Sequence, residues 1–172
     1  MENELESREG RPSLEFPTVE QIHIATHEGG PMKPLSEATA IPGIGLESDR
    51  YALAISTSSK ESSKDAGDPR EVTFIEGETL DSLRDAHGVA LFQGEHRRNI
   101  TTRGIPLNDL VGKRFRVGPV LCEGAELAHP CGYLQNKLGI PDLVQYLAGR
   151  GGIRARVLEG GTITIGDTVE LA

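Results

Sequence analysis

The last twenty residues alternate apolar and other side chains with a period of two, and this pattern constrains the fold more than any other. Glycine-containing turns interrupt the alternation twice. A period of two is the period of a β-strand, and short glycine turns between such runs are typical of hairpins. The pattern therefore predicts two hairpins at the C-terminal end. The residues concerned are Ile153, Ala155, Val157, Gly160-Gly161, Ile163, Ile165, Gly166-Asp167, Val169 and Leu171.

Short elements separated by turns are expected over the rest of the chain as well. The sequence has 21 glycines and 10 prolines, which favour many turns. Aromatic residues make up only 4% and tryptophan is absent, so the core must be aliphatic. The expected strands and helices do not alternate regularly, which argues against a doubly wound sheet. The sequence predicts a mainly β (α+β) fold, a closed or half-closed β-barrel with a few short helices.

Apolar residues spaced three and four apart mark the expected helices. One helix should follow a strand at 71–75 and end at a C-cap glycine, and another should start at Cys131. A third should have a proline as its first residue. The residues that mark these helices are Leu80, Leu83 and Gly88; Leu134, Leu138 and Gly139; and Pro141, Leu143, Leu147 and Gly149.

A chain of 172 residues fits one domain. Residues 1–15 are charged and show no periodicity, which predicts a flexible N-terminal tail. Residues 16–172 are expected to form the single domain. Within it, residues 56–69 have low complexity and should form a mobile solvent loop.

Composition also narrows the compartment and the partners. The net charge of −8 disfavours binding to nucleic acid over a broad surface. The polar N-terminus lacks the apolar segment of a signal peptide, and no apolar run is long enough to span a membrane. Two cysteines are too few for a disulfide scaffold. We therefore expect a cytoplasmic protein with reduced thiols and with neither nucleic acid nor membrane as a partner.

One segment departs from the acidic average. Between residues 97 and 116 there are six basic residues and a single acidic one, Asp109. Such a segment either binds a small anionic ligand or forms an ordinary solvated strand-loop face, and charge alone does not choose between them.

Cys131 is the strongest candidate for chemistry. It follows His129-Pro130 and opens an expected helix, where unpaired backbone N–H groups and the helix dipole favour a thiolate. A thiolate can carry a persulfide or bind a soft metal, although a buried structural cysteine is the alternative. His129 could act as an acid or base beside it, or be an ordinary histidine. Cys122 lies in an expected strand and is interpreted as core.

Arginine and amide side chains are the candidates for ligand binding. Arginine forks bind phosphate oxygens in bidentate fashion, and the carboxamide of Asn99 suits the edge of a heterocycle. A flexible Gly151-Gly152 turn could admit an anion close to the backbone. The candidate cofactor-binding residues are Arg50, Arg97, Arg98, Asn99, Thr101 and Arg154, with Thr102 as a further neighbour.

Taken together, these motifs resemble the MOSC domain, a module similar to the C-terminal domain of molybdenum cofactor sulfurases. The motifs occur in the order of that family and cover about residues 40–172. They are Gly45-x-x-x-Asp49-Arg50, Glu71-Val-Thr-Phe-Ile75, Arg98-Asn99-Ile100, Gly104-x-x-Leu107-x-x-Leu110-x-Gly112-x-x-Phe115-x-x-Gly118, Pro130-Cys131-x-x-Leu134, Gly151-Gly152-Ile153-Arg154-Ala155 and Gly160-Gly161-x-x-x-x-Gly166-Asp167.

The resemblance implies a β-barrel-type fold in which Cys131 corresponds to the functional cysteine. In sulfurase-type members that cysteine is thought to accept sulfur from a pyridoxal-phosphate cysteine desulfurase; in amidoxime-reducing members it ligates molybdenum held by a pterin. The expected ligand is thus a molybdenum cofactor (molybdopterin), with pyridoxal phosphate only on a partner desulfurase. A molybdoenzyme is the other expected partner. Arg50, Arg98, Asn99 and Arg154 match family positions.

Three hypotheses follow from the residues and the resemblance. In the first, Cys131 carries a persulfide to or from a bound molybdopterin-type cofactor, as a sulfurtransferase. In the second, the chain is a molybdenum-dependent reductase of N-hydroxylated compounds with Cys131 as the metal ligand. In the third, it is a non-catalytic binding module. We expect neither a desulfurase domain nor the N-terminal extension of larger amidoxime-reducing relatives, so the resemblance alone leaves all three open.

Overall fold

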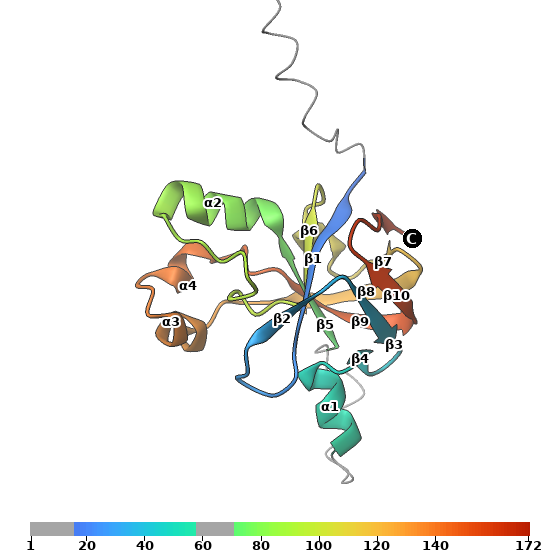
Figure 1. Ribbon diagram of the computed structural model, residues 1–172. Coiled ribbons are helices and arrows are strands. Elements are labelled where there is room, and N and C mark those ends of the chain that lie inside the picture. Colours follow the sequence, from blue (N-terminus) through green and yellow to red (C-terminus); the bar gives the residue numbers. More distant parts are fainter. Residues whose placement is uncertain (1–15, 58–70) are drawn as a thin grey trace, which may run out of the picture.

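The computed structural model describes residues 16–57 and 71–172 (Figure 1). The strands are β1 (Thr18–Ala25), β2 (Met32–Leu35), β3 (Glu37–Ile41), β4 (Gly45–Leu46), β5 (Val72–Glu76), β6 (Ile100–Arg103), β7 (Arg114–Val117), β8 (Val120–Leu127), β9 (Ile153–Glu159), β10 (Gly161–Thr164) and β11 (Val169–Leu171). The helices are α1 (Arg50–Thr57), α2 (Gly77–His87), α3 (Gly132–Leu138) and α4 (Leu143–Tyr146), with a 3-10 helix at Leu107–Leu110. The tail predicted at 1–15 and most of the loop predicted at 56–69 lie outside the described residues.

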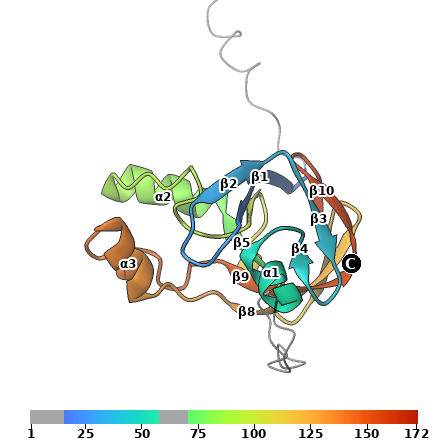
Figure 2. The ribbon, with the colours of Figure 1, turned by 60° about the horizontal axis from the view of Figure 1, so that its bottom comes forward.

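Most strands belong to one strongly curved sheet. Its eight strands follow the order β11-β7-β8-β9-β5-β6-β1-β2, and a smaller sheet has the order β10-β3-β4. β5 and β6 are parallel, whereas the other paired neighbours are antiparallel. The sheet curls until the segment before β11 reaches the start of β1, where Val19 N donates to Asp167 O at 2.9 Å. This half-open barrel confirms the predicted fold class (Figure 2).

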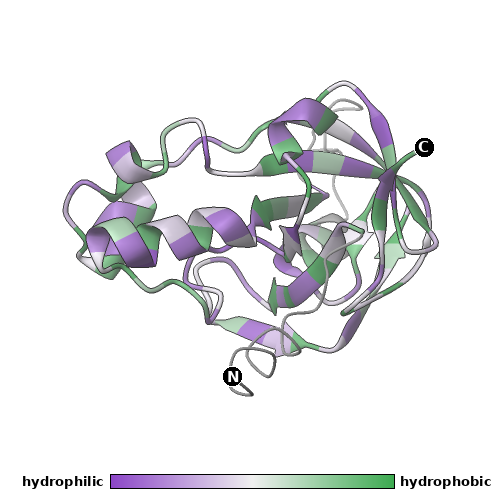
Figure 3. Ribbon diagram, turned by 90° about the horizontal axis from the view of Figure 1, so that it is seen from above, coloured by the Kyte–Doolittle hydropathy of each residue, from purple (hydrophilic) through white to green (hydrophobic). Residues whose placement is uncertain are grey.

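The core has two parts, and β5 separates them. The barrel encloses an aliphatic cluster around Phe74 and Phe115, whose rings meet edge to face at 5.5 Å. On the other side of β5, Ile75 packs with leucines of α2, α3 and α4. Because β5 is covered on both faces, its side chains from Val72 to Ile75 are all buried. Bands of hydrophobic and hydrophilic residues alternate along the elements (Figure 3).

The expected helix ends are confirmed for α2 and α3. Gly88 and Gly139 close them in the left-handed conformation, with φ of 68° and 63°. Pro141 was expected to begin the next helix, but α4 begins at Leu143 and Asp142 precedes it in a left-handed conformation. Pro141 therefore belongs to the turn that joins α3 and α4. Helix α1 was missed, and it runs through the first two residues of the expected loop.

The prediction of two C-terminal hairpins is wrong, although the three predicted strands are present. β9 pairs with β8 and β5, β10 pairs with β3, and β11 pairs with β7. Gly160 allows the crossing between the sheets, because a Cβ there would lie 2.7 Å from the carbonyl oxygen of Ala40. None of the helices in residues 16–57 and 71–172 is long and apolar enough to span a bilayer.

Candidate functional site

Cys131 lies where the barrel meets the helical cluster. β8 ends at Leu127, three residues lead away from the sheet, and Cys131 is the N-cap residue of α3 with φ −128° and ψ 162°. Its side chain is exposed. Cys122 is instead fully buried in the barrel, where burial and the nearby Glu71 raise the pKa of its thiol to about 12. Cys131 is therefore the reachable thiol of this chain.

The segment leading to Cys131 is fixed by a part-buried arginine from another part of the chain. Arg98 donates from Nε to Gly151 O at 2.8 Å and from Nη2 to Ala128 O at 3.3 Å. Ala128 N also donates to Gly152 O at 2.8 Å. One guanidinium thus ties together the end of β8 and the residues before β9.

The same guanidinium interacts electrostatically with several neighbours, Cys131 among them. Burial, with smaller contributions from Arg154 and Arg50, lowers the pKa of Arg98 to about 10, while Tyr51 and Cys131 oppose the shift. Arg98 therefore stays protonated at neutral pH. These interactions place Arg98 within electrostatic reach of two other arginines and of the exposed sulfur.

Gly151 and Gly152 do not leave space for an anion, contrary to the expectation from sequence. A Cβ on Gly151 would collide with Ala128 O, and one on Gly152 would collide with Phe74 O. Gly152 also has a φ of 92°. The two glycines are required because the backbone of the Cys131 segment and that of β5 pack directly against them.

Arg97 is buried beside the loop between β1 and β2. It is 9% exposed, has a φ of 63°, and donates from Nη1 to Gly30 O at 2.7 Å. Its Nη2 is buried, and the described residues offer it no hydrogen-bond partner. Burial lowers the pKa of Arg97, and the charge of Arg50 lowers it further. An unsatisfied buried donor with a second cation nearby is a feature that an anion would complete.

The other expected arginines have partners of their own. Arg50, the first residue of α1, donates from Nη2 to the Tyr51 hydroxyl at 3.0 Å. Arg154 forms an ion pair with Glu126 at 2.9 Å. Arg98 interacts electrostatically with Arg50, Arg154 and Cys131, whereas Arg97 interacts with Arg50 and not directly with Cys131.

Two expected ligand-binding residues lie within the fold instead. Asn99 Oδ1 accepts hydrogen bonds from Thr73 N at 3.0 Å and Thr73 Oγ1 at 3.1 Å, and its Nδ2 donates to His23 O at 3.1 Å. Its carboxamide therefore holds β5 and β1 beside the arginine segment. Thr101 has no exposed surface in β6, and its neighbour Thr102 is equally buried. His129 is exposed in the segment before Cys131.

Three of the four remaining basic residues of the 97–116 segment, Arg103, Arg114 and Arg116, form ordinary ion pairs. Arg103 is held by Glu20 and Asp81, and Arg116 pairs with Glu159 at 3.1 Å. For these residues the interpretation as an ordinary solvated face applies, and the interpretation as an anion-binding segment is left to Arg97 and Arg98. These first two arginines of the segment instead donate to backbone carbonyls, Arg97 to Gly30 O and Arg98 to Gly151 O and Ala128 O.

Sequence reasoning missed the histidine that precedes the arginine pair. His96 is 1% exposed, and its Nδ1 accepts a hydrogen bond from Arg98 N at 3.0 Å. Burial lowers the pKa of His96 to about 3, with smaller contributions from His23 and Arg98. The ring is therefore neutral with its proton on Nε2, and it meets His23 edge to face at 5.8 Å. The one sign of its role in the sequence is that it directly precedes the Arg97-Arg98 pair.

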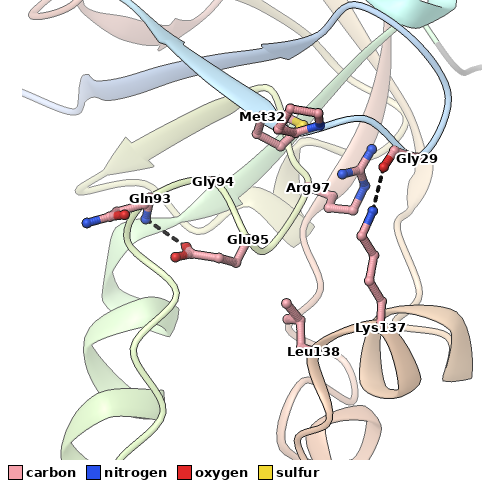
Figure 4. Close-up of a pocket in the computed structure, with 9 residues that line it drawn as sticks. Gly29, Met32, Gln93, Gly94, Glu95, Arg97, Lys137 and Leu138 are labelled. Atoms are coloured by element: carbon pink, nitrogen blue, oxygen red, sulfur yellow. Dashed lines mark hydrogen bonds between the residues drawn. The ribbon is translucent and has the colours of Figure 1, made fainter.

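A pocket of about 370 Å³ lies between the β1–β2 loop, the segment before β6 and helix α3 (Figure 4). Lys137 lines one side of the pocket and donates to Gly29 O at 2.7 Å. Its lining residues are Gly29, Pro31, Met32, Gln93, Gly94, Glu95, Arg97, Lys137 and Leu138. Across residues 16–57 and 71–172, no three His, Cys, Asp or Glu side chains cluster as a metal site.

Comparison with known proteins gives one family and several similar structures. The family model described as the MOSC domain matches residues 61–170. YiiM from Geobacillus stearothermophilus superposes with a TM-score of 0.69 at 18% identity, over 91% of this chain and 75% of that one. The YuaD protein from Bacillus subtilis also has a TM-score of 0.69, at 20% identity over 90% and 94% of the two chains. A search of curated proteins returned no match.

Proposed function

The chain belongs to the MOSC domain family, and from this premise we propose that Cys131 carries sulfur as a persulfide to or from a bound molybdopterin-type cofactor. The observation that carries the proposal is the exposed Cys131 sulfur on a segment that the part-buried guanidinium of Arg98 holds through Ala128 O and Gly151 O. The thiolate is the form of a cysteine that attacks sulfur, and an exposed thiol is open to a sulfur donor.

The transfer needs no external oxidant. The Cys131 thiolate attacks the outer sulfur of a donor persulfide, the S–S bond of the donor breaks, and the donor leaves as a thiolate. A new S–S bond forms on Cys131, so one disulfide-type bond replaces another and the oxidation level is unchanged. The exposure of Cys131 supports this role, because the donor persulfide on a cysteine desulfurase must reach the sulfur directly.

The residues around Cys131 fit an anionic cofactor. Arg50, Arg98 and Arg97 present guanidinium groups, and the buried Nη2 of Arg97 has no partner among the described residues. Guanidinium groups are suited to the phosphate of a pterin cofactor. When bound, that cofactor would supply the molybdenum centre that exchanges sulfur. Arg98 keeps the Cys131 segment in place, and Asn99 keeps the arginine segment on the sheet.

A second candidate is a molybdenum-dependent reductase in which Cys131 ligates the metal. One observation favours it: Cys131 is an exposed soft ligand, yet the described chain offers no cluster of further metal ligands. A metal at Cys131 would have to bring its other ligands with it, as molybdenum does on a pterin. Metal and pterin analysis of protein made in a molybdate-supplied host separates the two candidates.

The sulfur-carrier proposal is tested by transfer of radiolabelled sulfur. A pyridoxal-phosphate cysteine desulfurase is charged with ³⁵S-cysteine and mixed with wild type, Cys131→Ser and Cys122→Ser. We expect label that a thiol reductant releases on wild type and Cys122→Ser, and none on Cys131→Ser. Full labelling of Cys131→Ser would overturn the proposal. A His129→Gln variant added to the series measures whether the histidine assists the transfer.

A further inference from the structure

The pocket beside α3 has features that the sulfur chemistry of Cys131 does not require. Two cations reach its edge from different elements, Arg97 from the segment before β6 and Lys137 from α3. They donate to consecutive carbonyl oxygens, Arg97 to Gly30 O and Lys137 to Gly29 O, both at 2.7 Å. Their charged ends are therefore neighbours, as Figure 4 shows.

Both cations keep donors that the described part of the protein does not use. An ammonium group has three N–H donors, and the structure gives Lys137 one hydrogen bond, to Gly29 O. Arg97 is 9% exposed, and its Nη2 has no partner within the described residues. A buried guanidinium nitrogen without an acceptor is costly, and an anion in the pocket would satisfy it.

Charge and shape define what the pocket would accept. Glu95 is the acidic lining residue, and its carboxylate accepts a hydrogen bond from Gln93 N at 2.8 Å, so one negative charge faces the two cations. Arg50 adds positive charge near Arg97. Pro31, Met32 and Leu138 are apolar lining residues. A ligand with a phosphate or carboxylate joined to a small apolar body matches this combination.

The pocket and Cys131 lie along the same helix. Lys137 and Leu138 line the pocket at the end of α3, whereas Cys131 is the N-cap of that helix. Six residues of α-helix span about 9 Å. An extended ligand could thus place its reactive end at Cys131 and its anionic end in the pocket.

We propose that this pocket is an anion subsite for a ligand that lies along α3 and reacts at Cys131. The inference rests on the proposed function for the role of the reactive end. Two sources offer the same chemistry: the phosphate of the pterin cofactor, or the anionic group of a separate small molecule that donates or accepts sulfur.

The test uses phenyl phosphate as the probe, with binding measured by calorimetry on wild type, Lys137→Gln and Lys113→Gln. Lys113 is an exposed lysine outside the pocket and serves as the matched control. We expect saturable one-to-one binding that Lys137→Gln weakens about tenfold, since one charge-assisted contact is lost. Lys113→Gln should bind as wild type does. No saturable binding, or equal weakening by both variants, overturns the proposal.

Two further arms separate the alternatives. Cys131→Ser should bind phenyl phosphate as wild type does, so failure of the pocket and failure of the sulfur role give different results. Protein that carries the pterin cofactor is then compared with cofactor-free protein. Binding only to the cofactor-free form assigns the pocket to the cofactor phosphate, and binding to both forms assigns it to a separate anionic ligand.

Discussion

Arg98 donates from Nε to the carbonyl oxygen of Gly151 at 2.8 Å, across 53 residues of sequence. With its second bond to Ala128 O, this contact joins the segment that carries Cys131 to the start of β9. The side chain thus combines two tasks, fixing the position of the thiol and supplying positive charge near it.

Replacing Arg98 should therefore affect both stability and the thiol. We expect Arg98→Gln to lower the free energy of unfolding by about 2 kcal/mol, because hydrogen bonds from a charged donor are lost. Alkylation of Cys131 at pH 7 should also slow severalfold. Urea denaturation and iodoacetamide kinetics measure the two effects. Arg116→Gln, which removes an exposed ion pair with Glu159, is the control and should change neither.

The two cysteines should differ sharply in reactivity. Cys131 is exposed, whereas Cys122 is fully buried and burial raises the pKa of its thiol to about 12. At pH 7 we expect iodoacetamide to add one group to the native protein, and a second only after unfolding in urea. Mass spectrometry of intact protein and of its peptides reports the sites. Labelling of Cys122 in the native state would contradict the structure.

Local patterns in the sequence predicted the elements better than their partners. Period-two alternation identified β9, β10 and β11, but the pattern of a strand is the same whichever strand lies beside it. The two glycine turns therefore looked like hairpins, although β10 crosses to pair with β3. By contrast, the C-caps at Gly88 and Gly139 depend only on neighbouring residues and were predicted correctly.

In the candidate site, too, local features could be predicted and long-range partners could not. The placement of Cys131 at the start of a helix follows from its own neighbours, and the structure agrees. The partners of polar side chains could not be inferred, because they lie far along the chain. Asn99 appeared to be a ligand-binding amide in a polar loop, yet its acceptor is occupied by Thr73, 26 residues earlier. Gly151-Gly152 looked flexible, whereas backbone from two other segments fills the space beside it.

The buried His96 should make stability depend on pH. Burial lowers the pKa of His96 from 6.5 to about 3 in the folded protein. As pH falls, His96 therefore takes up a proton in the unfolded chain before it does so in the folded protein. The contribution of neutral His96 to the free energy of unfolding is fully present above pH 6.5 and is lost as pH falls toward 3. Burial also lowers the pKa of His23, which acts in the same direction. One proton changes the free energy of unfolding by at most about 1.4 kcal/mol per pH unit.

Urea denaturation at pH 7.5, 6 and 5 measures this dependence. We expect His96→Asn to flatten the decrease in stability between pH 6.5 and 5, because the buried titrating group is removed. The exposed His27 provides the control, and His27→Asn should keep the wild-type slope. An unchanged slope in His96→Asn would show that other groups govern the acid sensitivity.

The close packing at Gly152 gives the sharpest test of the fold around the site. A Cβ at this position would collide with Phe74 O, and the φ of 92° disfavours any side chain. We expect Gly152→Ala to destabilise the protein by about 3 kcal/mol or more, since steric overlap and backbone strain add. Gly132, the first residue of α3, has open space where a Cβ would lie, so Gly132→Ala should be neutral or slightly stabilising. Thermal unfolding of both variants is the measurement, and equal stabilities would mean that the backbone of β5 does not pack directly against Gly152.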